Sequence, residues 1–167
     1  MQSFLSFATF NTDQTPFLET YLSVNANSLA LIKDKNSYYG EVDVKINITS
    51  NNDLVFQDYY ILKSPIFEKK SNNNIFFIDQ QRIPLDKGEY LLELIVSDTQ
   101  TNFTKTHSEK IIIDYDHTSL SDIQLIDNYS IAENESVLSK SGYKLSPFIS
   151  NFYPGTINKL AYYVEVY

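Results

Sequence analysis

The sequence predicts an all-β fold, a two-sheet antiparallel sandwich, from three observations. Its 167 residues include 13 Tyr and 11 Phe, and aromatic and β-branched residues favour strands. Apolar segments recur at short intervals, separated by Asn, Asp, Gly, Pro and Ser, which suit turns. No segment of any length shows the 3.6-residue apolar period of an amphipathic helix.

Two stripes of alternating apolar residues predict the core. In the first, Val42, Val44, Ile46 and Ile48 alternate with charged or polar residues, so the strand buries one face. The second stripe consists of Tyr90, Leu92, Leu94 and Val96. Ile111 or Ile113 is also expected in the core. Further strands are expected at 4–10, 17–24, 29–32, 54–62, 75–78 and 110–115. About eight strands before residue 117 are typical of a β-sandwich.

A local motif makes the predicted sandwich immunoglobulin-like. Residues 86–90 read Asp-Lys-Gly-Glu-Tyr, the D-x-G-x-Y form found at the start of strand F in such domains. There the tyrosine packs into the corner between the strands and its hydroxyl bonds to upstream backbone. Tyr90 is therefore interpreted as a structural residue of the core, in preference to a ligand contact.

The chain after residue 117 differs in composition and is predicted to lie outside this first domain. We expect a sandwich over 1–117, a linker with a short strand over 118–142, and the opening strands of a truncated second module over 143–167. A shift of 142 positions pairs Phe10 with Phe152, Leu18 with Leu160, Tyr21 with Tyr163 and Val24 with Val166. This is either a repeat or a coincidence among aromatic-rich strands. An incomplete module would dock on the sandwich, pair with another copy, or be poorly ordered.

Charge and composition exclude several function classes. The net charge is −8 and the pI is near 4.6, which argues against a nucleic-acid partner because phosphate binding needs clustered Lys and Arg. No segment has the ~20 apolar residues of a membrane span. Cysteine is absent, which removes disulfides, thiolate metal sites and cysteine nucleophiles.

The remaining chemistry-bearing residues predict neither an enzyme nor a cofactor or metal site. His107 and His117 are separated by a predicted strand and lack a metal-ligand pattern, so surface histidines are expected. Asp114 and Asp116 could contribute to calcium binding, but a solvated strand end is favoured because calcium needs six to eight oxygens. The sequence contains no phosphate loop, nucleophile elbow or zinc-protease motif.

Two tyrosine pairs are the candidate ligand-binding residues. Tyr38–Tyr39 and Tyr59–Tyr60 could present aromatic faces to a glycan, and Tyr39 and Tyr60 are the predicted contacts. Adjacent residues of a strand point to opposite faces. Each pair is therefore expected to contribute one core ring and one surface ring, and ordinary packing is the favoured interpretation.

Several stretches resemble the amino-terminal β region of the GWxTD-domain proteins of Bacteroidota. They lie at 17–24 (FLETYLSV), 77–85 (FIDQQRIPL), 88–94 (GEYLLEL), 120–125 (LSDIQL), 138–143 (LSKSGY), 150–154 (SNFYP) and 159–166 (KLAYYVEV). The similarity falls on polar as well as apolar positions and runs over nearly the whole chain. The naming motif, Gly-Trp-x-Thr-Asp, is absent because the chain has no Trp.

The resemblance implies an exported protein of the cell envelope, periplasmic or associated with the outer membrane, and it supplies no catalytic residues. The amino terminus lacks the features of a signal peptide, so a leader would already have been removed. We expect a non-catalytic interaction or scaffolding module with a protein partner in the envelope, and self-association through 143–167. The alternative is a glycan-binding sandwich that uses exposed tyrosines.

Overall fold

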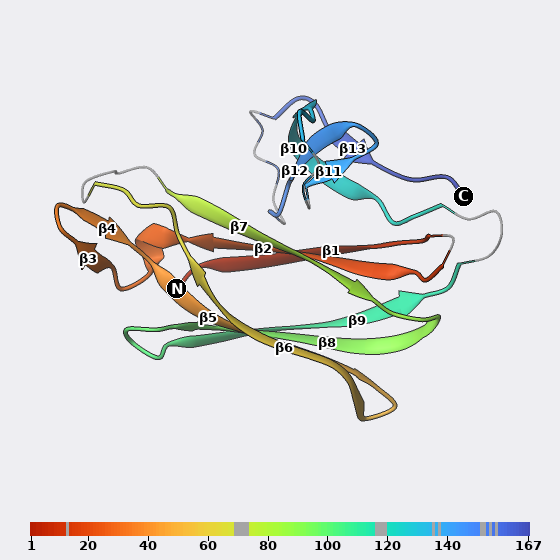
Figure 1. The fold of residues 1–167 in the computed structure, drawn as a ribbon, viewed down its shortest axis with the longest axis horizontal. Coiled ribbons are helices and arrows are strands. Elements are labelled where there is room, and N and C mark those ends of the chain that lie inside the picture. Colours follow the sequence, from red (N-terminus) through yellow and green to blue (C-terminus); the bar gives the residue numbers. More distant parts are fainter. Residues whose placement is uncertain are drawn as a thin grey trace. The chain divides into compact units, whose positions relative to one another are not determined.

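The protein is all-β in the computed structural model, which confirms the predicted fold class, an antiparallel β-sandwich (Figure 1). The structure describes residues 1–12, 14–68, 74–115, 120–134, 136, 138–150, 153, 155 and 157–167. Within these residues, thirteen strands and one short 3-10 helix, Ala26–Ser28, account for the regular structure.

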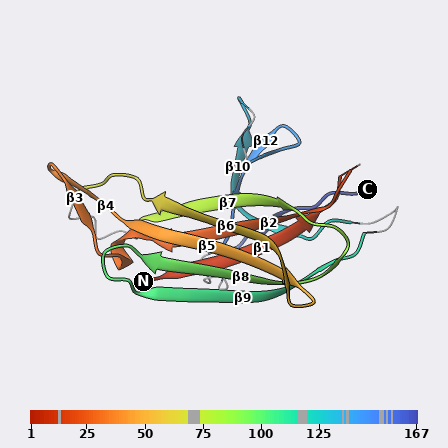
Figure 2. The ribbon, with the colours of Figure 1, turned by 60° about the horizontal axis from the view of Figure 1, so that its bottom comes forward.

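Two sheets have the strand order of an immunoglobulin-like sandwich. The first has the order β1-β2-β7 and the second β6-β5-β8-β9, so β8 occupies the position of strand F. Figure 2 shows β5, β6, β8 and β9 side by side. The strands are β1 Ser3–Phe10, β2 Phe17–Asn25, β5 Glu41–Ser50, β6 Asp53–Lys63, β7 Phe76–Pro84, β8 Gly88–Asp98 and β9 Thr104–Ile113.

The two predicted core stripes lie side by side on the same face of the β5–β8 ladder. Antiparallel pairing sets Val44 opposite Val96 and Ile46 opposite Leu94. Every predicted core residue is buried: Val42, Val44, Ile46, Ile48, Tyr90, Leu92, Leu94, Val96, Ile111 and Ile113. Side chains that alternate with them remain partly or fully exposed, as the period of two requires.

Tyr90 lies where the D-x-G-x-Y motif predicts it, at the start of β8 and in the core. Its ring packs on Gly88, and a Cβ placed on that glycine would lie 3.3 Å from the tyrosine hydroxyl. The small residue therefore leaves room for the ring two positions further along the strand.

The carboxyl-terminal third of the chain forms a separate sheet of order β11-β12-β10-β13. Its strands are β10 Gln124–Ile131, β11 Ser139–Lys140, β12 Tyr143–Pro147 and β13 Ala161–Tyr163. β10 pairs with β12 on one side and with β13 on the other. The strands from residue 143 onward therefore share a sheet with β10, inside the segment predicted as a linker.

The chain divides into two compact units that do not follow chain order. One comprises residues 1–3, 23–79 and 88–112, and the other comprises 4–22, 80–87 and 113–167. The second unit has a buried cluster of Ala8, Phe10, Tyr21 and Ile149. The domain boundaries expected at residues 117 and 142 remain predictions.

Three strand predictions are corrected. β9 begins at Thr104, earlier than predicted, because its first half is largely exposed and carries no apolar alternation. Residues 29–32 hold no separate strand; the short hairpin of β3, Ile32–Asp34, and β4, Ser37–Tyr39, follows instead. β7 runs to Pro84, well beyond the predicted 75–78.

Two hairpins turn through two residues with positive φ. Asn51 (φ 50°) and Asn52 (φ 72°) join β5 to β6, and Ser141 (φ 50°) and Gly142 (φ 81°) join β11 to β12. Type I′ turns need positive φ at both central residues, and their twist matches that of the flanking strands. Asn and Gly are the residues that adopt this conformation most readily.

Replacing Asn52 by valine should lower the free energy of unfolding by about 1–2 kcal/mol, the cost of a left-handed backbone at an ordinary L-residue. Asn52→Gly keeps the conformation accessible and should not destabilise. Urea denaturation of the two variants measures the difference. Equal stabilities would show that the turn conformation does not constrain this hairpin.

Candidate functional site

A largely buried network of side chains lies in the second unit, and its three charged members come from three segments of the chain. Glu19 on β2 is completely buried, and its carboxylate is 2.6 Å from the Lys140 ammonium and 2.5 Å from Arg82 Nε. The Tyr21 hydroxyl donates a hydrogen bond to the same carboxylate. Lys140 on β11 also donates to Gln124 Oε1 at 2.9 Å. Glu19 is thus held by two cations and a hydroxyl.

Aromatic rings complete the surroundings of Lys140. Its ammonium lies 3.4 Å from the centre of the Phe10 ring and 5.2 Å from that of Tyr163. A cation over an aromatic face is stabilised by the ring quadrupole, most strongly where water is excluded. The Lys140 side chain is only 5% exposed, so these contacts replace its hydration.

Burial shifts the pKa values of this network. The pKa of Lys140 is lowered to about 8 because burial, with Arg82 adding to it, outweighs the attraction of Glu19. The pKa of Tyr21 is raised well above its ordinary value, first by burial and then by the adjacent Glu19 carboxylate. The network therefore holds a lysine that loses its proton far more readily than an exposed one.

Lys140 should titrate near pH 8 when followed by nuclear magnetic resonance of 13C-labelled lysine, with Lys140→Met identifying its signal. In the unfolded chain the lysine keeps its ordinary pKa of 10.5, so from about pH 8 to 10.5 the unfolded state binds more protons. The stability of the native protein relative to Lys140→Met should therefore rise with pH over this window. A constant or falling difference would contradict the shift.

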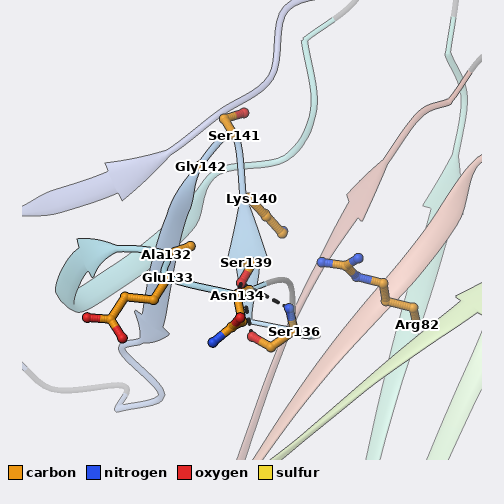
Figure 3. A pocket seen from close by; sticks show the side chains of 9 residues that line it. All are labelled: Arg82, Ala132, Glu133, Asn134, Ser136, Ser139, Lys140, Ser141 and Gly142. Carbon is orange, nitrogen blue, oxygen red and sulfur yellow. Dashed lines mark hydrogen bonds between the residues drawn. The ribbon is translucent and has the colours of Figure 1, made fainter.

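A polar pocket of about 400 Å³ lies beside the network (Figure 3). Arg82 lines one side, with its guanidinium directed toward Ser136 and Ser139, and the Glu133 carboxylate points away from the pocket. The two serine hydroxyls are 3.0 Å apart, and Ser139 Oγ accepts from the Ser136 backbone N–H. Its remaining lining comes from Ala132, Asn134, Lys140, Ser141 and Gly142.

An uncharged groove of about 430 Å³ lies on the sheet of β10, β12 and β13. The lining residues are Ile126, Tyr129, Tyr143, Leu145, Leu160, Ala161, Tyr162 and Tyr163. Ile126 and Leu145 are buried, while Tyr129, Tyr143, Leu160 and Tyr162 are exposed. The Tyr129 and Tyr143 rings meet edge to face with their centroids 6.3 Å apart. The groove is thus an apolar floor bordered by solvent-facing tyrosines.

The two predicted ligand tyrosines lie in different sheets of the first unit. Tyr39 is half-buried on β4, with the Lys63 ammonium 5.6 Å from its ring centre. Tyr60 is half-buried on β6, and its hydroxyl donates to the Asp79 carboxylate. Its neighbour Tyr59 is exposed, as strand alternation requires. The structure does not bring Tyr39 and Tyr60 into one sheet.

The histidine and acidic candidates are placed only in part. His107 is half-buried on β9, and its Nε2 lies 3.1 Å from Ser3 Oγ, so it is not a simple surface histidine. Burial, with Lys105 nearby, lowers its pKa. Asp114 lies 3.4 Å from the Lys87 ammonium. His117 and Asp116 lie outside the described residues, and those residues contain no group of three or more His, Cys, Asp or Glu side chains suited to a metal ion.

Sequence reasoning missed both the charged network and the groove. The one local signal for the network was Glu19, an acidic residue within the predicted strand 17–24, whose other residues are apolar, hydroxylic or aromatic. For the groove, the signal was the clustering of Tyr129, Tyr143 and Tyr162 in a part of the chain taken as linker and truncated module.

Fold and site together define an antiparallel immunoglobulin-like sandwich with an internal ion network and an exposed tyrosine-lined groove. Compared with protein families, curated proteins and solved structures, the chain gives no match. Among the described residues, no helix has the length and apolar character needed to cross a membrane.

Proposed function

We propose that the protein is a non-catalytic interaction or scaffolding module that binds a protein partner in the cell envelope. The observation that carries this proposal is the exposed apolar surface of the β11-β12-β10-β13 sheet. Tyr129, Ile131, Tyr143, Leu160 and Tyr162 are all exposed there, and four of them line the groove. Contiguous exposed apolar surface with a polar rim commonly marks an interaction site.

The proposed setting, an exported envelope protein of Bacteroidota, rests on the resemblance to the GWxTD-domain proteins. Membership of that family can be tested directly from the gene that encodes the chain. A Gly-Trp-x-Thr-Asp motif encoded downstream of Tyr167 and a signal sequence upstream would support it. A gene whose complete product has neither would contradict it.

Photo-cross-linking in envelope extracts tests the interaction function. A photoreactive phenylalanine analogue at position 162 should capture a partner that the same analogue at position 59 does not. The two sites are matched, because Tyr162 on β13 is 60% exposed and Tyr59 on β6 is 61% exposed. Equal capture at both sites, or no specific capture at position 162, would contradict the proposed surface.

Glycan binding remains the second candidate, and the groove gives it an observation of its own. Tyrosines bordering an uncharged groove can stack on the apolar faces of sugar rings. A glycan array with the wild-type chain and with Tyr39→Ala, Tyr60→Ala and Tyr129→Ala separates the possibilities. Binding lost in Tyr39→Ala or Tyr60→Ala supports the sequence-predicted contacts, whereas loss only in Tyr129→Ala assigns the glycan to the groove.

A further inference from the structure

One edge of β10 is only partly paired with a neighbouring strand. β13 pairs with Gln124, Leu125 and Ile126, and no described strand pairs with residues 127–131 on that side. All five of these residues are exposed. We refer to residues 127–131, on the side away from β12, as the open flank.

The hydrogen-bond register shows which backbone groups face the open flank. The Ala132 N–H donates to the Gly142 carbonyl, so residues 132, 130 and 128 direct their backbone groups toward β12. Tyr129 and Ile131, which alternate with them, direct theirs to the open flank. An extended chain laid there would find donors and acceptors at the spacing of a strand.

The open flank carries a side-chain cap at one of these positions. The Tyr129 N–H donates to the side-chain Oδ1 of its neighbour Asn128 at 2.9 Å. The exposed Tyr59 N–H of β6 is held by Asp58 Oδ1 in the same way at 2.8 Å. Each contact occupies a backbone donor that would otherwise be free to pair with another chain. An incoming strand would have to displace the Asn128 amide.

Charge and lining restrict the chemistry of the incoming strand. The groove beside the flank is uncharged and has an apolar floor, which suits apolar side chains. Asp127 begins the flank and Glu133 lies two residues beyond its other end; both residues are exposed, and the whole chain carries −8. Lys144 is paired opposite Ser130 on the β12 side. Basic side chains between the apolar ones would therefore be favoured.

From this geometry we infer that the open flank of β10 and the adjoining groove bind an extended, basic, alternately apolar segment of a protein partner by strand addition. This inference rests on the proposed interaction function and names the partner's chemistry. Strand addition takes its affinity from main-chain hydrogen bonds and its specificity from alternate side chains.

Four seven-residue peptides test the proposal by fluorescence anisotropy with the full chain. They are a Val–Lys alternation, its Val–Glu and Ser–Lys counterparts, and the Val–Lys peptide with alternate backbone amides methylated. The Val–Lys peptide alone should bind, because only it combines apolar side chains, positive charge and free amides. Equal binding of the Ser–Lys or methylated peptide, or no binding by any peptide at millimolar concentration, overturns the proposal.

Backbone variants locate the site. Ile131→Pro removes an N–H that faces the flank while sparing the bonds to β12, and proline is tolerated at such edge positions. It should weaken Val–Lys binding about tenfold, the factor that 1.4 kcal/mol represents. Ile131→Val keeps the N–H and should bind normally, and Asn128→Ala frees the Tyr129 donor and should bind several-fold more tightly. Unchanged affinity in a folded Ile131→Pro variant overturns the proposal.

The same variant separates this inference from the function on which it rests. If cross-linking at position 162 captures a partner equally well in Ile131→Pro, the interaction function stands and strand addition at this flank is overturned. If the variant blocks peptide binding but the wild type captures nothing in envelope extracts, the chemistry of the flank is supported and the proposed function fails.

Discussion

Glu19→Leu should lower the free energy of unfolding by about 3–5 kcal/mol, because it leaves the buried Lys140 ammonium without its carboxylate. Lys140 is 5% exposed, and Arg82 adds a second positive charge next to the site. The remaining hydrogen bond to Gln124 cannot replace a charge. Guanidinium denaturation followed by circular dichroism measures the loss.

The double variant Glu19→Leu/Lys140→Met should recover most of that loss. An apolar pair of similar volume needs no charge compensation, and such replacements are often neutral or stabilising. Arg82 retains contact with water because its side chain is 39% exposed. Lys110→Ala, which removes the partner of Glu89 in a pair whose side chains are 62% and 67% exposed, serves as a control and should have a far smaller effect because water screens that pair. Additive losses in the double variant would refute the coupling.

Leu94→Ala should cost about 2–5 kcal/mol, the range found when a buried leucine is truncated and leaves a cavity. Leu94 is completely buried on β8 and paired opposite Ile46. The matched control is Leu91→Ala on the same strand, where the side chain is 44% exposed and the loss should stay below about 1 kcal/mol. Similar losses for both variants would contradict the assigned faces of β8.

The core could be predicted from the sequence wherever burial follows a period of two. Val42 to Ile48 and Tyr90 to Val96 alternate because each strand has one wet face, and the structure buries the residues expected. The first part of β9 escaped detection because residues 104–110 are mostly exposed on both faces and therefore carry no apolar period. An apolar period of two indicates that one face of a strand is buried. It gives no signal where both faces are exposed and the strand is held mainly by backbone hydrogen bonds.

The charged network could not be predicted for a different reason. Glu19, Arg82 and Lys140 come from three distant segments, and none of their sequence neighbourhoods requires the other two. Their proximity depends on strand pairing and register, which composition does not specify. Tyr39 and Tyr60 show the opposite case. The aromatic pairs are evident in the sequence, but the residues that contact each ring or hydroxyl in the fold are not. Chemistry-bearing residues were identified more easily than the contacts that define their roles.

The two-residue turn at Ser141 and Gly142 has a consequence for how this chain can vary in length. It pairs Lys140 with Tyr143, and this register directs the Lys140 side chain inward to Glu19. A single inserted residue would force either a bulge or a slipped ladder, and a slip by one position exchanges the two faces of a strand. Insertions at this turn are therefore expected to be tolerated only when they preserve the pairing, whereas other exposed loops can change length at little cost.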